Sequence, residues 1–327
     1  MSQHWHVLGA GAIGGVFAKR LMAMGTPTTL LTRHASAVGQ QLIFKGDAGQ
    51  ETLELSCETL INTSTITHLL VCTKAFDIEP AVQAALPKLT PDAIVVLLAN
   101  GMGYHATVAN LLGAQTLIAG STTAGCYKTS AMQWHIVSEG HTRLGNWSRS
   151  DSCPADLTSW FTQPWSCAWE TDITSVLLEK ALINAAINPP TALHDIPNGE
   201  LLAPPYLGEF EAALEELEAL VAVLLENARE HDAHEARTAP PAILDKTTLQ
   251  ALHKDLSARI KGVAMATAAN TSSMRADYQQ GRRTEIEAIL GYLLGDVLDN
   301  LPNPQAVPAL PILSRWLRTV RQRDSRL

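Results

Sequence analysis

A lysine and two asparagines recur at every fourth position of an otherwise apolar segment, as Lys180, Asn184 and Asn188. In a helix this spacing places all three side chains on one face. Asn is a poor helix former, so a plain solvent face would more often carry Glu, Lys, Arg or Gln. The pattern favours a cleft in which Lys donates a proton or holds an anion and Asn both donates and accepts hydrogen bonds. An ordinary solvated stripe is the alternative.

A GxGxxG motif near the N-terminus is formed by Gly9, Ala10, Gly11, Ala12, Ile13 and Gly14. It follows a predicted strand that ends at Leu8 and opens a predicted helix over 13–24, which is the context of a dinucleotide-binding loop. The three glycines permit a tight turn, the approach of a pyrophosphate and close helix–strand packing, respectively. The helix N-terminus offers free N–H groups to the anion. A glycine-rich turn without a ligand is the alternative.

Cations stand where an NAD site usually carries an acid, about 20 residues after the motif. The second predicted strand ends in Leu31-Thr32-Arg33, and Lys74 ends the third near the same edge. A guanidinium suits a 2′-phosphate, so the two cations together favour NADPH. Solvated surface cations are the alternative for each one.

Asn100 follows a buried strand, and ligands of open parallel sheets bind beyond the carboxyl ends of strands. We therefore expect Asn100 to touch the nicotinamide end or the substrate, although an Asn-Gly turn explains the dipeptide equally well. Farther along, Ser272 or Ser273 would cap a short helix. Thr284 and Glu287 have the spacing of a capping box.

The first half alternates strands with helices, which predicts parallel βαβ units. The predicted strands are 6–8, 28–31, 68–72, 94–98 and 117–119, with helices over 13–24 and 78–86. Residues 131–145 suggest a hairpin that extends the sheet. The chain is thus expected to be an α/β protein, with an N-terminal Rossmann-type dinucleotide-binding domain over 1–168 and an all-helical C-terminal domain over 169–327.

The second half has helical periodicity. The predicted helices are 173–187, 207–231, 249–269, 285–298 and 312–321. Pro189 and Pro190 are expected to end the first of them, because proline lacks the N–H that a helix interior needs. The final residues 321–327 are expected to be frayed.

Composition and charge argue against several classes of protein. The formal net charge of -8 argues against a nucleic-acid surface. Five cysteines without CxxC spacing give no zinc pattern and no disulfide framework, which favours the cytoplasm. The chain shows neither a signal peptide nor a membrane span. His231 and His234 lack further ligands, so no metal site is expected.

The order of motifs resembles the ketopantoate reductase family. It comprises GAGAIGG, CTKA, NGMG, the Lys-Asn-Asn-Pro helix, PNGEL, and SSM followed by TEI. The resemblance implies a Rossmann domain followed by a helical domain, with the active site in the cleft between them. The chain departs from the family pattern at Pro190, where a Leu is more usual. It also departs at His194-Asp195-Ile196, which precedes PNGEL.

By this resemblance, Lys180 would be the catalytic general acid. Substrate contacts would come from Lys180, Asn184, Asn188, Asn198 and Ser273. Cofactor contacts would come from Gly9, Ala10, Gly11, Ala12, Ile13, Gly14, Arg33, Lys74, Asn100, Ala124 and Glu285. The resemblance implies NADPH-dependent reduction of 2-dehydropantoate to pantoate, a step of pantothenate and coenzyme A biosynthesis.

Expected partners are a small keto acid, with no nucleic acid and no membrane, in a monomer or homodimer. Two alternatives stay open. One is a reductase of the same fold that acts on another keto acid, which a substrate panel would separate. The other is a non-catalytic NADP-binding sensor, against which the lysine-bearing stripe argues because a sensor needs no proton donor.

Overall fold

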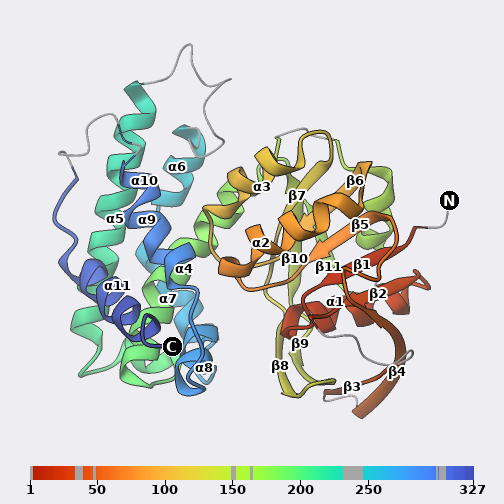
Figure 1. The fold of residues 1–327 in the computed structure, drawn as a ribbon. Helices are drawn as coiled ribbons and strands as arrows, with labels where there is room; N and C mark the ends of the chain where they lie inside the picture. Colours follow the sequence, from red (N-terminus) through yellow and green to blue (C-terminus); the bar gives the residue numbers. More distant parts are fainter. Residues whose placement is uncertain are drawn as a thin grey trace. The chain divides into compact units, whose positions relative to one another are not determined.

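The computed structural model describes residues 3–33, 40–46, 49–148, 152–162, 165–230, 246–299, 301 and 307–327. The chain forms two compact units, one of residues 1–99 with 104–173 and one of residues 100–103 with 174–327. The described strands all belong to the first unit, and the second is built of helices (Figure 1). The short segment 100–103 therefore leaves the strand unit and packs with helical residues, where Met102 N–H donates to the Ala288 carbonyl at 2.7 Å.

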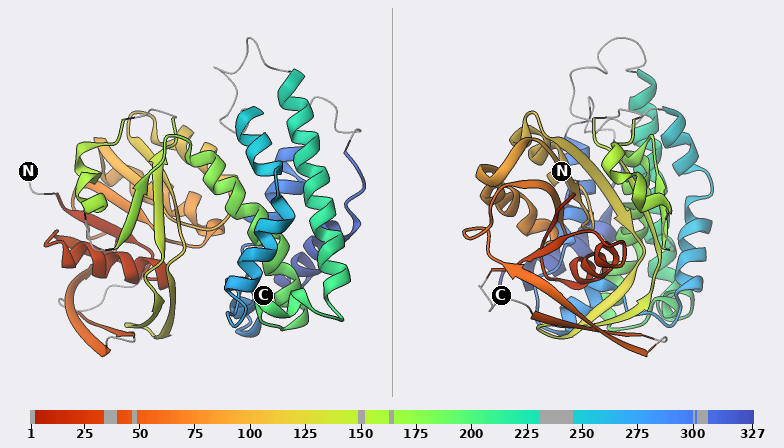
Figure 2. Two further views of the ribbon diagram at one scale, coloured as in Figure 1. Left: turned by 180° about the vertical axis from the view of Figure 1, so that it is seen from behind. Right: turned by 90° about the vertical axis from the view of Figure 1, so that its right-hand side faces the viewer.

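Six strands of the first unit form a parallel sheet in the order β7–β6–β5–β1–β2–β4. Their bounds are β1 Trp5–Leu8, β2 Thr28–Leu31, β4 Gly49–Glu58, β5 Ile66–Val71, β6 Leu89–Leu97 and β7 Thr116–Thr122. The connecting helices are α1 (Ala12–Ala23), α2 (Ala75–Ala85) and α3 (Tyr104–Leu112). Right-handed connections leave β1 and β5 in opposite directions, so α1 covers one face and α2 with α3 the other (Figure 2). The predicted Rossmann-type fold is confirmed.

The strand order reverses between the adjacent strands β1 and β5. Ligands of such sheets bind beyond the carboxyl ends of the strands at this point. Both strands are buried on both faces, as the covering helices require. Large aromatic side chains fill the core of the unit, where Trp5, Phe17, Trp134 and Trp160 are fully buried.

The hairpin predicted over 131–145 is wrong. Strands β9 (Gln133–Ser138) and β10 (His141–Asn146) exist, but β9 pairs with β8 (Gly125–Ser130) and β3 (Gln40–Gly46), whereas β10 pairs with β7 and β11 (Ser166–Trp169). Gly140, at φ 61°, fits against the backbone of Thr123 and Ala124, where a Cβ would lie 2.3 Å from the Ala124 nitrogen. The chain therefore changes partners at Gly140 instead of folding back on itself.

The helical unit contains one long helix that passes through two prolines. Helix α4 runs from Ile173 to His194, so the expected end before Pro189 and Pro190 is wrong. Both prolines are buried, and the Thr191 hydroxyl donates to the Ile187 carbonyl at 2.7 Å in the same turn. Tertiary packing outweighs the unfavourable helix propensity of proline here.

The other helices of this unit are partly as predicted. Their bounds are α5 Leu207–Glu230, α6 Lys246–His253, α7 Leu256–Ala266, α8 Ser273–Gln279, α9 Tyr292–Leu294, α10 Asp296–Asp299 and α11 Pro311–Asp324. The predicted helix over 249–269 is two helices, because Asp255 adopts a left-handed φ of 55° between α6 and α7. The predicted helix over 285–298 begins instead as a π-helical turn over Glu287–Gly291 and is then broken at Gly295, φ −115°.

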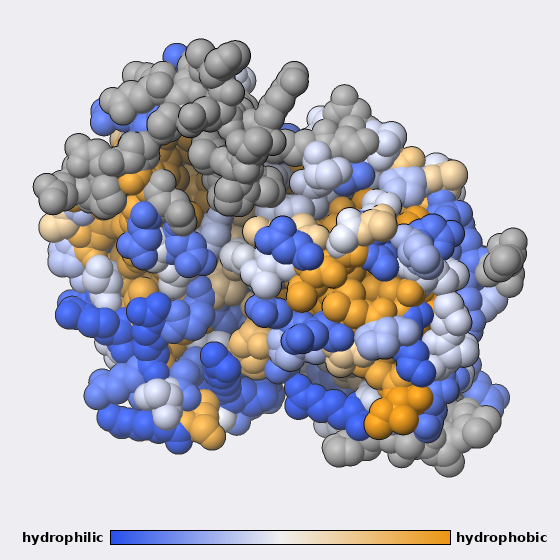
Figure 3. Space-filling model, turned by 45° about the horizontal axis from the view of Figure 1, so that its top comes forward, coloured by the Kyte–Doolittle hydropathy of each residue, from blue (hydrophilic) through white to orange (hydrophobic). Residues whose placement is uncertain are grey.

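No helix in the described ranges has an apolar stretch long enough to cross a membrane. On the face in Figure 3, hydrophobic residues form patches bordered by hydrophilic ones. Within the same ranges, no group of three or more His, Cys, Asp or Glu side chains is arranged to hold a metal ion. His231 and His234, considered above as metal ligands, lie outside the described residues.

Candidate functional site

Two glycines of the motif that joins β1 to α1 are required by the fold itself. Gly9 has a φ of 108°, and a Cβ there would lie 2.9 Å from the carbonyl carbon of Cys72. A Cβ on Gly14 would lie 1.9 Å from the Gly9 carbonyl oxygen. These close approaches bring the end of β5 against the loop and the first turn of α1 against the end of β1, as the first and third glycines of the motif are expected to do.

Gly11 differs, because no contact within the described parts of the chain requires a glycine there. Its φ of −77° and ψ of −168° suit any residue, and a Cβ would meet only the Cys72 carbonyl oxygen, at 3.7 Å. Gly11 is the N-cap of α1, with no side-chain cap and no acidic residue in the first turn. Free N–H groups and open space at a helix N-terminus fit a pyrophosphate, so the loop fits a dinucleotide.

Arg33 and Lys74 both lie just beyond the carboxyl ends of parallel strands, but an acidic residue accompanies them. Arg33 follows β2, and its guanidinium donates to the Asp77 carboxylate at 2.8 Å while remaining 80% exposed. Asp77 lies in the first turn of α2, and Lys74 is the N-cap of that helix. The structure thus brings Arg33 to the N-terminus of α2, with an acid beside it that the sequence pattern does not indicate.

Ala124 lies at the turn where the chain passes from β7 to β8. Its N–H donates to the Thr122 hydroxyl at 3.2 Å. The Gly140 backbone packs against it from the neighbouring strand connection. The position of Ala124 is therefore fixed by the crossing of these two connections.

The polar stripe predicted from the sequence lies on α4. Lys180 and Asn184 are partly exposed, and Asn188 is buried. One turn farther, Thr191 extends the stripe, and its hydroxyl contacts the Ser272 hydroxyl at 2.8 Å. This buried contact places the start of α8 beside the C-terminal end of the stripe.

The two neighbouring serines have different roles at the start of α8. Ser272 is the N-cap, since its hydroxyl accepts from the Arg275 N–H at 3.1 Å and also contacts Thr191. Ser273 is the first residue of the helix and is exposed. The capping function suggested for either serine therefore belongs to Ser272, and the Ser273 hydroxyl is accessible to a ligand.

A buried carboxylate, Glu285, links Asn100 to the lysine of the stripe. The Asn100 amide donates to Glu285 Oε2 at 3.1 Å. The negative charge of Glu285 acts on Lys180 and favours its protonated form. Burial has the larger, opposite effect, so the Lys180 pKa is lowered from 10.5 to about 8. The ammonium can therefore release its proton near neutral pH, which suits a general acid.

Asn198 carries a buried hydrogen-bond acceptor in the helical unit. It begins a 3-10 turn over Asn198–Leu202, and its amide donates to the Thr267 hydroxyl at 3.0 Å. Its Oδ1 is buried without a hydrogen-bond partner in the described ranges. A buried acceptor of this kind is costly unless it is satisfied, so it suits a hydrogen bond from a ligand.

Residues 5–149 match the sequence family described as "Ketopantoate reductase PanE/ApbA", and residues 172–295 match its C-terminal counterpart. This chain belongs to the ketopantoate reductase family. It is 30% identical to the 2-dehydropantoate 2-reductase of Vibrio cholerae, with 97% of each chain covered. It is 28% identical to that of Halobacterium salinarum, with 97% of this chain and 98% of the relative covered.

Solved structures share the same fold. The PanE/ApbA family ketopantoate reductase from Ralstonia eutropha JMP134 superposes with a TM-score of 0.77 at 20% identity and covers 99% of each chain. D-mandelate dehydrogenase with NADH and anilino(oxo)acetate gives a TM-score of 0.78 at 16% identity and covers 98% of each chain. The protein is an oxidoreductase of the ketopantoate reductase family, and membership implies a nicotinamide dinucleotide cofactor. The sensor alternative is set aside.

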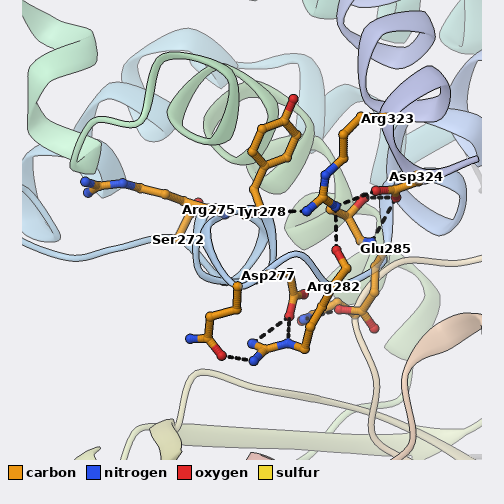
Figure 4. A network of polar contacts seen from close by, with 11 residues as sticks. Ser272, Arg275, Asp277, Tyr278, Arg282, Glu285, Arg323 and Asp324 are labelled. Atoms are coloured by element: carbon orange, nitrogen blue, oxygen red, sulfur yellow. Dashed lines mark hydrogen bonds and ion pairs between the residues drawn. The ribbon is translucent and has the colours of Figure 1, made fainter. Parts of the chain in front are cut away.

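In this member of the ketopantoate reductase family, the C-terminal helix holds the segment that carries Glu285 (Figure 4). Asp324 of α11 accepts from the Thr284 N–H at 2.8 Å and from its hydroxyl at 2.7 Å. Arg323 donates to the Arg282 carbonyl and, at 2.9 Å, to the Tyr278 carbonyl. These bonds fix the backbone on both sides of the turn that precedes Glu285.

Two expectations about this region are wrong. Thr284 and Glu287 do not form a capping box, because Asp324 takes the Thr284 N–H and Glu287 pairs with Arg321 through two contacts of 2.6 Å. The C-terminal tail is not frayed, since α11 continues to Asp324. The sequence pattern did not single out Arg323 and Asp324, because a run of charged and polar residues has the composition of a solvated tail.

Proposed function

We propose that the protein reduces 2-dehydropantoate to pantoate with NADPH, with Lys180 as the general acid. The observation that carries the proposal is the lysine–asparagine face of α4 with the buried Glu285 beside Lys180. The substrate class is the one in the names of the relatives at about 30% identity. The reaction would belong to pantothenate and coenzyme A biosynthesis. The five cysteines are free thiols, which supports a cytoplasmic location.

When bound, NADPH supplies a hydride to the C2 carbonyl carbon of the keto acid. The carbonyl oxygen then needs a proton, and the Lys180 ammonium delivers it, which completes the hydroxyl group of pantoate. The ammonium also stabilises the negative charge that develops on this oxygen. Glu285 keeps a larger fraction of Lys180 protonated than burial alone would allow. Lys180 regains its proton from solvent before the next turnover.

The remaining polar residues would orient the substrate. A keto acid with a hydroxyl and a carboxylate needs both donors and acceptors, which asparagine and serine supply. Asn184 and Asn188 lie on the Lys180 face of α4, and Ser273 lies at the start of the adjoining helix α8. The unsatisfied Oδ1 of Asn198 would accept from the substrate hydroxyl. Correct orientation of the carbonyl contributes to the rate without any further chemistry.

The proposed cofactor-binding residues belong to the first unit, except Asn100 and Glu285, which belong to the second. The backbone of 9–14 would hold the pyrophosphate, and Arg33 with Lys74 would contact the 2′-phosphate. Ala124, Asn100 and Glu285 would contact the remainder of the dinucleotide. In this assignment Glu285 serves both the cofactor and the acidity of Lys180.

A substrate panel tests the proposed reaction. Purified protein would be assayed by the loss of NADPH absorbance with 2-dehydropantoate and with other branched 2-keto acids, and each assay would be repeated with NADH. We expect the highest kcat/KM with 2-dehydropantoate and NADPH. Faster turnover of a different keto acid would contradict the substrate assignment and leave the role of Lys180 intact.

The Arg33→Ala variant tests the cofactor preference. Loss of a charge-assisted contact to the 2′-phosphate should raise the Kd of NADPH about tenfold and leave that of NADH unchanged. Asp77→Asn is the matched variant, because it removes the acid that pairs with Arg33. It should tighten NADPH, since a negative charge next to the phosphate is lost. Equal effects of Arg33→Ala on both dinucleotides, measured by calorimetric titration, would contradict the assignment.

The pH profile tests the coupling between Lys180 and Glu285. Lys180 must be protonated to act, and its pKa is lowered to about 8, so kcat/KM for ketone reduction should fall above that pH. Glu285 raises the Lys180 pKa, so Glu285→Gln should move the descending limb to lower pH. A limb that stays in place, or that moves to higher pH, would rule out this coupling.

A further inference from the structure

The β8–β9 hairpin packs directly on the start of α1, beside the phosphate-binding loop. Trp134 of β9 is fully buried, and its indole N–H donates to the Gly11 carbonyl at 2.9 Å. A Cβ on Gly15 would lie 2.2 Å from the indole nitrogen, so Gly15 makes room for this ring. The hairpin therefore fixes the carbonyl side of the loop and leaves the N–H side for a ligand.

Lys128 of β8 stands opposite Trp134 in the strand register. Its ammonium donates to the Ala10 carbonyl at 2.7 Å and lies 5.0 Å from the centroid of the Trp134 ring. This places a positive charge at the residue between the first two glycines of the motif. The side chain is held by a hydrogen bond and a cation–π contact, although the residue is exposed.

The charge of Lys128 is not neutralised within the described parts of the chain, where it has no ion pair with a carboxylate. Glu139, the acid that follows β9, pairs with Arg20 at 3.0 Å. The Ala10 carbonyl uses one of the three ammonium protons, so two protons are left. Burial of part of the side chain lowers the Lys128 pKa, so a nearby anion would stabilise the charged form.

We propose that Lys128 is a further cofactor-binding residue, whose ammonium contacts the pyrophosphate of the dinucleotide while it remains bonded to the Ala10 carbonyl. The position at Ala10 favours the pyrophosphate over the 2′-phosphate, because Arg33 follows a different strand and is held at the start of α2. The inference rests on the proposed function only in needing a nicotinamide dinucleotide, of either kind.

The test compares Lys128→Met and Lys128→Arg with Lys88→Met. Lys88 is a matched control, because its ammonium also donates to a backbone carbonyl, that of Ile61, but away from the loop. The Kd values of NADPH and NADH would be measured by calorimetric titration at several NaCl concentrations. We expect Lys128→Met to weaken both dinucleotides about five- to tenfold, with an unchanged ratio, whereas Lys128→Arg and Lys88→Met stay near the wild type.

Salt dependence separates a direct contact from a change in loop shape. Loss of an ammonium–phosphate contact should make the Kd of Lys128→Met less sensitive to NaCl than that of the wild type, whereas a reshaped loop would weaken binding at an unchanged salt dependence.

An unchanged salt dependence, or unchanged Kd values, would overturn the role of Lys128 and leave the proposed function standing. An effect on NADPH alone would overturn the assignment to the pyrophosphate. A wild type that binds NADH but not NADPH would overturn the cofactor proposal, while the NADH arm still tests Lys128. Failure of the wild type to bind either dinucleotide would overturn both.

Discussion

Replacement of Lys180 by Ala is expected to lower kcat by roughly 10²–10⁴-fold, the range for loss of a positioned general acid. The lysine lies on the polar face of α4, and burial already disfavours its charged form. Water in the space left by the side chain would be a poorer and less well oriented donor. Steady-state kinetics with a saturating keto acid would give kcat directly, and the dinucleotide Kd should change little.

The Lys180→Arg variant separates charge from proton donation. Arginine keeps a positive charge but does not give up its proton near neutral pH. It should therefore retain part of the anion binding and still have a low kcat. Lys261→Ala is a surface control, since Lys261 pairs with Glu211 on the exposed side of α7 and should have wild-type kinetics. A Lys180→Ala variant with near wild-type kcat would rule out the acid assignment.

Replacement of Gly11 by Ala is expected to weaken the dinucleotide at least about tenfold without destabilising the unliganded protein. The protein accepts a Cβ at this position, with an ordinary contact of 3.7 Å to the Cys72 carbonyl oxygen. The bound pyrophosphate does not, because it approaches the backbone where the Cβ would project. Calorimetric titration of NADPH and thermal unfolding of the unliganded protein would measure the two effects separately.

Gly14→Ala is the matched comparison in the same motif. Its Cβ would lie 1.9 Å from the Gly9 carbonyl oxygen, so the protein itself must rearrange. This variant should lower the unfolding temperature of the unliganded protein, which Gly11→Ala should not. Equal thermal destabilisation by the two substitutions would show that the fold itself requires Gly11. The argument that Gly11 makes room for a ligand would then be lost.

Much of the fold follows from the sequence because local patterns dominate there. The strand 28–31 has the predicted bounds, and α1 and α5 begin or end within a residue or two of the predicted positions. The pattern of apolar runs and helices predicts five of the six parallel strands, and it misses β4, which pairs with β2. The pairing of strands could not be predicted in the same way. The alternation of apolar and polar residues along β9 and β10 does not specify which strand each one pairs with.

The predicted helix ends are wrong where tertiary packing, and not local propensity, determines where a helix stops. Pro189 and Pro190 are buried inside α4, although proline usually ends a helix. Asp255 divides a segment of continuous helical periodicity because it takes a left-handed backbone conformation. Neither outcome is encoded in local propensity alone.

The candidate site could be anticipated only in part. The face of Lys180 and its two asparagines follows from helical spacing. The bond between Asn100 and Glu285 joins residues 185 positions apart, which no spacing rule predicts. The Asp324 anchor at Thr284 likewise depends on where α11 packs. Such contacts come from the fold of the whole unit.

The most direct test of the proposed reaction is to trace the hydride from NADPH into the product. Purified protein would be incubated with 2-dehydropantoate and NADPH that carries deuterium at the transferable C4 position, and the product would be analysed by mass spectrometry and NMR. We predict one pantoate for each NADPH consumed, with one deuterium at C2 and none at the hydroxyl. NADPH consumed without C2-deuterated pantoate, or not consumed at all, would contradict the proposed reaction.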